Sequence, residues 1–498
     1  MKDKIVNLKG KFFTAGPNRL EWGVALSAFF LIFTTMFYSD NFGMFLTYFW
    51  ENEELFTGKS IDFFGTMQLP YGLAHQWLCQ IWVLPINLFY HLFEFDFNSP
   101  MAVLWYKLCI PVFLVICMRE MRCIADTLGI EAKRIKWMLF LFVTTVLVAL
   151  PVFHVAQTDA LYLLFMLKGF HALLKKDTKK FLLWFAISVS FKVISLFIFI
   201  PLILLEEKRI LYVLRNLILG CVIVPIQQVW YRIIAALNSV LFPVDQSADP
   251  MAAVVETAAA AETAGTVETQ AGVVEGFYSH FFNKSLYFEF PAVRKGYVAS
   301  LLIFLFVLLC IWCYMQKKEE TEKWQQKCLY AAAISLALFF VMASPSPYWI
   351  VILYPFLFLL IYTNHDRLRF NLILEKAFTM TMFLVYVMNT YWVYGGAQSF
   401  DWLFLTKWGI VPFGHEFQGG PNIAGYLEKI SVDKFMPIIT AVCLASIIGI
   451  AWINYPKVKC DEELTEEYKI ELQHGMAIFN TLFLLVWYVV NVILISRY

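Results

Sequence analysis

Long apolar stretches alternate with short polar loops along most of the chain. Thirteen stretches are apolar over a length typical of a membrane helix. They begin near Gly23, Leu73, Met101, Trp137, Thr158, Phe181, Tyr212, Tyr297, Lys327, Tyr348, Lys376, Phe435 and His474. Because lipid offers the backbone no hydrogen-bonding partner, such stretches cross a membrane as α-helices. We therefore predict an all-α polytopic membrane protein.

Composition and the N-terminus agree with this prediction. Hydrophobic residues occupy 60% of the 498 positions and charged residues only 15%, which is too apolar for a water-soluble domain. Residues 1–22 carry five basic side chains and precede the apolar run Gly23 to Tyr38 without a following small-x-small cleavage site. We expect a retained first span, with residues 1–22 in the cytoplasm.

The distribution of Lys and Arg changes how two apolar stretches are interpreted. If Leu73 to Leu92 crossed the membrane, the basic loop Arg119 to Lys136 would lie outside, against the positive-inside rule. We therefore predict an interfacial helix on the outer surface, broken by Pro85. Its polar residues are His75, Gln76, Gln80, Asn87 and His91.

The second stretch, Phe181 to Leu205, has basic loops on both sides, so it must enter and leave by the same face. We predict a turn between two short helices at Ser188 to Lys192. A turn near the outer face also spares Lys192 the cost of a charge at mid-bilayer, about 2.5–3.5 kcal/mol. With both changes the sequence predicts about thirteen crossings.

These assignments divide the chain into four regions. Residues 23–243 form the predicted transmembrane core with a first outer loop at 40–100, and residues 297–498 form further helices with an outer loop at 395–434. Between them, residues 244–296 form an acidic, Ala-rich outer loop. Its part from Val244 to Glu275 has no aromatic residue to bury, so we expect a disordered tether.

Polar residues gather where predicted helices emerge at the outer face. The three ionisable residues Asp40, Asp159 and Lys192 each have an ordinary structural explanation. Asp40 could be a solvated helix end, Asp159 an acid favoured by the helix dipole, and Lys192 a snorkelling lysine. Their placement on one face favours a site, because ionisable groups at membrane depth are costly. The set comprises Asp40, Asp62, Gln68, Tyr71, Gln157, Asp159, Lys192 and Tyr348.

The order of these motifs resembles the GT-C superfamily of membrane glycosyltransferases, and within it the bacterial proteins similar to GPI mannosyltransferases. The resemblance covers roughly Asp40 to Pro355. It rests on an acid after span one, a long outer loop with two surface helices, the Gln157 to Tyr162 span opening, the Ser190-Phe191-Lys192 hairpin followed by Pro201, and the Ser344 to Tyr348 segment leading to Tyr354-Pro355.

The resemblance implies transfer of a mannose-like hexose from a polyprenyl-phosphate carrier to an extracytoplasmic glycan, lipid or protein acceptor, with inversion. It implies Asp40 as the general base, Asp159 as a second acid, and Lys192 as a phosphate or hydroxyl contact. Tyr348 would line the carrier site. The remaining expected substrate-binding residues are Asp62, Gln68, Tyr71 and Gln157.

The chain departs from the family in its late outer loop, where Pro347 precedes Tyr348 in place of an acidic-basic pair. Phosphate recognition is therefore open; Arg294 is one candidate, and the others are Lys295, His75, His154 and Lys407. A divalent cation is compatible with carboxylates near a phosphate, although no ligand cluster has diagnostic spacing.

Two other classes remain open. A transporter or flippase of lipid-linked saccharides would show internal repeats and charges near the midplane, and we find no convincing repeat. A membrane scaffold or sensor would use the tether and the outer loop 395–434, whose aromatic residues an interfacial belt explains equally well. We expect a multi-pass cell-membrane enzyme with an extracytoplasmic site, in contact with membrane lipids and not with nucleic acid.

Overall fold

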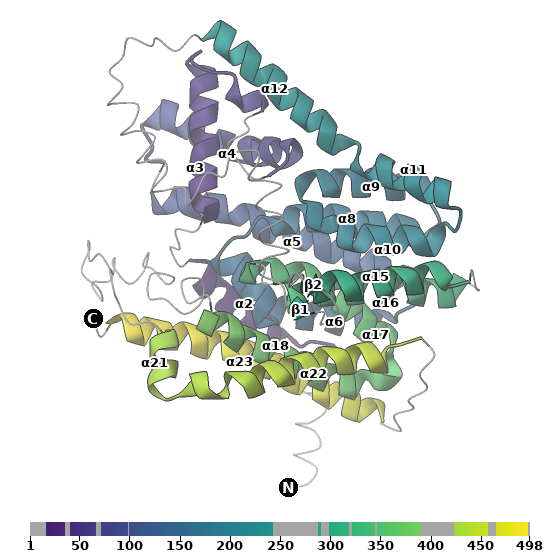
Figure 1. Cartoon of the computed structure of the whole chain (residues 1–498). Helices are drawn as coiled ribbons and strands as arrows, with labels where there is room; N and C mark the ends of the chain where they lie inside the picture. The colour runs from purple at the N-terminus through teal and green to yellow at the C-terminus, as the bar shows by residue number, and fades with distance from the viewer. Residues whose placement is uncertain are drawn as a thin grey trace.

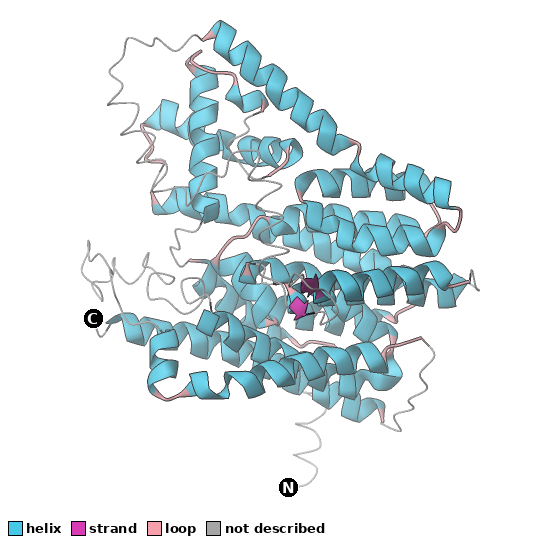
Figure 2. Ribbon diagram, viewed as in Figure 1, coloured by secondary structure: helices cyan, strands magenta, loops and turns pink. Residues whose placement is uncertain are grey.

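The structure is a computed structural model that describes residues 16–34, 40–65, 71–97, 99–242, 287–289, 298–317, 321–343, 346–389, 423–456 and 465–496. It is a bundle of helices, with one short pair of antiparallel strands (Figures 1 and 2). The predicted acidic tether, Val244 to Glu275, lies outside the described residues.

The elements follow in chain order. They are α2 (Arg19–Phe33), α3 (Asp40–Phe56), η1 (Asp62–Phe64), α4 (Leu73–Phe93), α5 (Pro100–Thr127), α6 (Ala132–Thr144), α7 (Val146–Ala149), η2 (Leu150–His154), α8 (Asp159–Leu174), α9 (Thr178–Phe191), η3 (Val193–Ser195), α10 (Leu196–Glu206), α11 (Ile210–Cys221), α12 (Ile223–Leu241), β1 (Tyr287–Glu289), β2 (Val298–Ser300), α15 (Leu301–Met315), α16 (Thr321–Met342), η5 (Pro347–Ile352), α17 (Leu353–Thr363), η6 (His365–Arg367), α18 (Leu368–Asn389), α21 (Ile423–Lys429), η8 (Val432–Phe435), α22 (Met436–Ile453) and α23 (Glu466–Ser496).

Several helices are long and apolar enough to cross a membrane, as expected of a multi-pass membrane protein. The described residues hold six such helices, or seven if the bent pair Ala132–Thr144 and Val146–His154 is one span. Three further apolar helices are shorter: Val193–Glu206, Leu301–Met315 and Pro347–Thr363. The predicted number of about thirteen crossings is therefore not confirmed, because several apolar stretches form helices shorter than a bilayer requires.

The predicted turn at Lys192 is confirmed. Helix α9 ends at Phe191, Lys192 has an extended backbone, and α10 begins four residues later after η3. Phe185 and Phe199, each seven residues from Lys192, stack with ring centroids 5.0 Å apart. The two short helices therefore fold back on each other, with Lys192 at the tip of the hairpin.

Helices α3, α4 and α12 lie together at one end of the bundle (top of Figure 1). The prediction that Pro85 breaks the second of these was wrong, since α4 continues through it to Phe93. Its polar face is buried against α3: the Asn87 amide donates to the Phe49 carbonyl and to Glu53. In the sequence, the polar residues of α4 favoured a helix on the membrane surface. In the structure, they form hydrogen bonds to α3.

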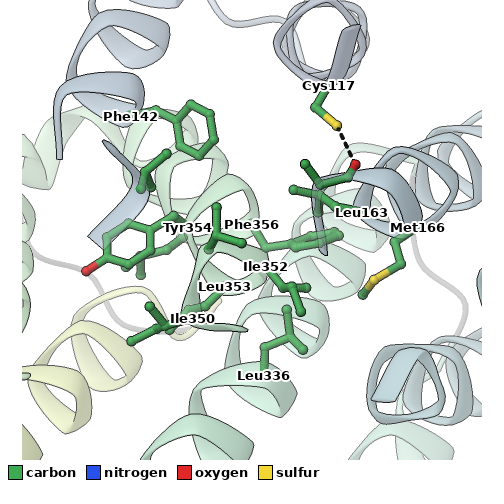
Figure 3. Packing of buried hydrophobic residues seen from close by; sticks show 14 of the residues in the cluster. Cys117, Phe142, Leu163, Met166, Leu336, Ile350, Ile352, Leu353, Tyr354 and Phe356 are labelled. Atoms are coloured by element: carbon green, nitrogen blue, oxygen red, sulfur yellow. Dashed lines mark hydrogen bonds between the residues drawn. The ribbon is translucent and has the colours of Figure 1, made fainter. Parts of the chain in front are cut away.

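The centre of the bundle is packed with apolar side chains of η5 and α17 against α8. Figure 3 shows Ile352, Leu353 and Phe356 in the same buried cluster as Leu163 and Met166 of α8. Cys117 of α5 also contacts α8, through a hydrogen bond from its Sγ to the Ala160 carbonyl at 3.4 Å. This packing fixes the start of α8 relative to η5, and both contribute to the site described next.

Candidate functional site

A buried ion pair joins the start of α8 to the tip of the α9–α10 hairpin. The Nζ of Lys192 donates to Oδ1 of Asp159 at 2.9 Å. The Asp159 side chain is fully buried, and that of Lys192 is 14% exposed. Lys192 reaches Asp159 because its backbone is extended where α9 ends. The structure thus brings together two residues that the sequence predicted on one face.

Aromatic rings from three segments surround the ammonium group of Lys192. Its Nζ lies 3.4 Å from the ring centroid of Trp349, 5.4 Å from that of Tyr71 and 5.6 Å from that of Tyr162. A cation over an aromatic face is stabilised by about 0.5–2 kcal/mol. The three aromatic rings and the Asp159 carboxylate therefore offset the free-energy cost of removing the charge of Lys192 from water.

Gly72 is the reason that Tyr71 can approach this pair. A Cβ atom at Gly72 would lie 1.8 Å from the Ser190 carbonyl oxygen and 2.9 Å from Oε1 of Gln227. Only glycine allows the N-terminus of α4 to pack so closely against the end of α9. Ser190 is two residues from Lys192 in the chain. The close approach therefore holds one wall of the site in position.

The site contains buried oxygen atoms with no hydrogen-bond partner among the described residues. They are Oγ1 of Thr158, Oδ2 of Asp159 and the hydroxyl of Tyr162. The Tyr162 hydroxyl lies close enough to Asp159 for the two groups to interact. Buried polar atoms in folded proteins almost always have partners. The free carboxylate oxygen of Asp159 and the Tyr162 hydroxyl, beside a buried cation, are therefore suited to a polar ligand.

A second layer of polar residues supports Tyr71 from α3 and α4. The Tyr71 ring stacks on His75 at 4.3 Å, and the Tyr48 hydroxyl lies 3.2 Å from Nδ1 of His75. Burial, with a smaller contribution from the charge of Lys192, lowers the pKa of His75 to about 3. His75 is therefore a neutral imidazole, and it contributes a ring and a hydrogen bond instead of a charge.

Glu51 lies in the same layer, and its sequence context did not predict a place in the site. Both Gln76 and Gln80 donate to its Oε2, at 3.1 and 2.6 Å. Burial raises the pKa of Glu51 to about 8, although the two amide bonds act in the opposite direction. At neutral pH this carboxyl group is mostly protonated. In the sequence it stands among other acids, Glu53 and Glu54, which resemble a solvated face.

Asp62 lies beside this layer and connects it to α12. Its carbonyl accepts from Nε2 of Gln76 at 3.0 Å, and its Oδ1 accepts from the Asn238 amide at 3.3 Å. The backbone of the neighbouring Ile61 also bonds to Asn238. Asp62 therefore joins η1 to α4 and α12, and it does not contact the Asp159–Lys192 pair directly.

The other predicted site residues are distributed unevenly. Asp40 is the first residue of α3, and its side chain lies outside the described part of the structure. Gln68 and Arg294 also lie outside it, as do the further phosphate candidates Lys295 and Lys407. Gln157 is buried just before α8. Tyr348 is buried in η5, but the ring that covers Lys192 belongs to its neighbour Trp349.

The arrangement is suited to binding an anion and a hydroxyl group at the same place. Within the described ranges, no group of three or more His, Cys, Asp or Glu side chains is placed to hold a metal ion. The phosphate candidate His154 is buried in η2, and His75 stacks on Tyr71. No protein-family model, curated protein or solved structure matches the chain.

Proposed function

We propose that the protein is an integral membrane glycosyltransferase that moves a hexose from a polyprenyl-phosphate carrier to an extracytoplasmic acceptor. The observation that carries the proposal is the buried Asp159–Lys192 pair, lined by three aromatic rings and by unpaired oxygen atoms. Phosphate needs a cation, sugar hydroxyls need hydrogen-bond partners, and the apolar faces of a sugar ring pack on aromatic rings. One site offers all three.

Lys192 binds the phosphate of the carrier, exchanging part of its contact with Asp159 for the ligand. Oδ2 of Asp159 and the hydroxyl of Tyr162 then bond to hydroxyl groups of the sugar. Trp349 and Tyr71 pack against the sugar ring. As the bond between the anomeric carbon and the phosphate oxygen breaks, negative charge grows on that phosphate, where Lys192 stabilises it.

Asp40 is the proposed general base. It opens α3, and Tyr48 two turns later contacts His75 of the same site, so the helix begins roughly 12 Å from that contact. The carboxylate takes the proton of the acceptor hydroxyl, whose oxygen attacks the anomeric carbon from the face opposite the phosphate. Polyprenyl phosphate leaves with the bonding electrons, and the configuration at the anomeric carbon inverts.

An apolar groove beside α4 is the proposed place for the prenyl chain. It has a volume of about 300 Å³ and lies between α4 and α5. Trp82 and Trp105 line the groove and stack with their ring centroids 5.1 Å apart, and each indole N–H donates to the backbone carbonyl of the other. A rigid apolar wall on the helix that carries His75 suits a lipid whose head group lies at Lys192.

The test is sugar transfer from radiolabelled polyprenyl-phosphate hexose by membranes with matched amounts of wild type, Asp40→Asn or Asp159→Asn. The proposal expects transfer by the wild type and a loss of about 100-fold or more in each variant, because each loses a group that acts in the transition state. Equal transfer by Asp40→Asn would remove Asp40 as the base. Absence of transfer by the wild type would contradict the proposed reaction with this donor.

A transporter of lipid-linked saccharides is the second candidate, and one observation favours it. Inside the bundle, the Thr379 hydroxyl donates to the buried Glu375 at 2.7 Å and lies 2.7 Å from the Tyr354 hydroxyl. Buried ionisable groups of membrane proteins often mark a transport path. Movement of labelled lipid-linked sugar across proteoliposomes without transfer, abolished by Glu375→Gln, would support this function instead.

A further inference from the structure

Helix α11 lies at the edge of the bundle beside α9 and presents a large apolar surface outward (Figure 1). Three of its residues are buried against its neighbours: Val213, Asn216 and Gly220. Three apolar residues on its other side are 72%, 80% and 54% exposed; these are Ile210, Leu211 and Leu214. The helix begins Ile210–Leu241, an apolar segment long enough to cross a membrane. Lipid is therefore the expected surroundings of this exposed surface.

Two arginines meet over one aromatic ring at the start of this segment. The guanidinium carbons of Arg209 and Arg215 lie 3.8 and 4.7 Å from the ring centroid of Tyr212. Side chains of a helix lean toward its N-terminus, so Arg215 in the second turn reaches back toward Arg209, which precedes the first turn. The two guanidinium groups are therefore neighbours at the end of an apolar segment, which is the level of lipid head groups.

The two arginines differ in the groups that hold them. Arg209 pairs with Glu207, through Nε at 3.0 Å and Nη2 at 2.9 Å. Arg215 donates from the same two nitrogen atoms to Oδ1 of the buried Asn216, at 3.3 and 3.1 Å. Among the described residues Arg215 forms no ion pair. A neutral amide therefore holds this guanidinium in place without offsetting its charge.

These contacts favour the phosphate of a lipid as the ligand. A guanidinium carries five N–H donors in a planar fork, which matches the oxygen atoms of a phosphate. Hydrogen bonds between two such charged groups are about twice as strong as neutral ones. The positive-inside rule predicts this end of the segment on the cytoplasmic side, beside the leaflet that holds anionic lipids. The exposed apolar side chains of α11 suit the acyl chains of the same molecule.

We propose that the start of α11 binds an anionic phospholipid, with Arg215 as the principal contact of the phosphate and Arg209 as a second one. Tyr212 holds the two guanidinium groups side by side, and the acyl chains lie along the exposed apolar side of the helix. The site shares no residue with the Asp159–Lys192 pair and does not depend on the function proposed above. Bound lipid stabilises the folded chain, as any ligand of the native state does.

The experiment measures phosphatidylglycerol bound to the purified full chain in detergent, by native mass spectrometry and by the rise in melting temperature. Phosphatidylcholine and glycerol 3-phosphate are the comparison ligands, and both should bind more weakly. Arg215→Gln is expected to weaken phosphatidylglycerol binding by about fivefold or more, and Tyr212→Leu by about threefold. Arg232→Gln, which changes an exposed arginine near the other end of the same apolar segment, is the matched control.

Unchanged phosphatidylglycerol binding in Arg215→Gln would overturn the proposal. Equal binding of phosphatidylcholine would also overturn it, since Arg215 would then only extend to water at the membrane surface. An equal loss in Arg232→Gln would show a general charge effect and would have the same consequence. Equal stabilisation by glycerol 3-phosphate would show that the acyl chains are not recognised, and the assignment to a lipid would fail. If Arg215→Gln does not fold, Tyr212→Leu decides between these outcomes.

Discussion

Two buried acid–base pairs in this protein differ in how their carboxylates are used. Glu21 bonds through Oε1 to Nδ1 of His474 at 2.6 Å, and its Oε2 accepts from the backbone of Asn18 at 2.8 Å. Both oxygen atoms are therefore occupied. Asp159 bonds through Oδ1 to Lys192, whereas its buried Oδ2 has no partner among the described residues. Both carboxylates are buried, and they differ in the number of hydrogen-bonding atoms left without a partner.

The difference separates a structural pair from a candidate site. Glu21 also closes a capping box at the start of α2, and its bond to His474 ties this helix to α23 near the other end of the chain. Such a saturated pair links elements and leaves no atom for a ligand. An unsaturated pair costs folding free energy, which proteins tolerate where function requires it.

The largest effect on stability is expected from Glu21→Gln. This substitution leaves His474 without its acid, so the free energy of unfolding should fall by about 3–5 kcal/mol. Transfer per folded molecule should stay near that of the wild type. Denaturant unfolding and the transfer assay measure the two quantities. A loss of transfer by folded Glu21→Gln comparable to that of Asp159→Asn would remove the distinction between the pairs.

Glu51 extends the comparison to a third buried carboxyl group. Its pKa is raised from 4.5 to about 8 in the folded protein, so the folded state holds the proton that the unfolded state loses. Stability should therefore fall as pH rises from about 4.5 to about 8, by a few kcal/mol in total, and change little above that range. Glu51→Gln should flatten this dependence. A pH profile of unfolding that is identical in wild type and variant would contradict the buried, protonated state.

Gly72→Ala tests how the wall of the site is held. The added methyl group would collide with the Ser190 carbonyl, so α4 must shift away from the hairpin and carry Tyr71 with it. Transfer should fall by roughly 10- to 100-fold, because small displacements of a positioned group are costly. Gly425→Ala, where an added Cβ has no neighbour within 4 Å, is the control. Full activity of Gly72→Ala would show that Tyr71 is not needed in its place.

The smallest effect on transfer is expected from the Trp349 ring that lies over Lys192. Trp349→Leu removes the closest aromatic contact of Lys192 and keeps an apolar side chain, so transfer should fall by about threefold to thirtyfold. Trp184→Leu, which removes a similar ring from Lys168 at 4.9 Å elsewhere on the bundle, should have no such effect. Equal effects of the two variants would assign the loss to packing.

The sequence predicted those features that depend on residues close together in the chain. Basic loops on both sides of one apolar stretch predicted the turn at Lys192, and a polar opening of an apolar run pointed to Asp159. The predicted number of about thirteen spans is not confirmed among the described residues, because hydropathy does not show where a helix ends early, as in α10 or α15. Contacts between residues far apart in the chain could not be predicted from the sequence either. Nothing near Trp349 indicates that it covers Lys192, and Glu51 is buried only because α4 folds over it.

We propose that the Asp159–Lys192 pair is a binding site, and a comparison of two lysines separates that role from a structural one. Both Lys192 and Lys168 lie over a tryptophan ring, and only Lys192 bonds to a fully buried carboxylate. The decisive measurement is sugar transfer from labelled polyprenyl-phosphate hexose by Lys192→Gln and Lys168→Gln at matched expression. Lys192→Gln should lose about 100-fold or more of its transfer, and Lys168→Gln should transfer at a rate near that of the wild type. Equal transfer by the two variants would contradict it.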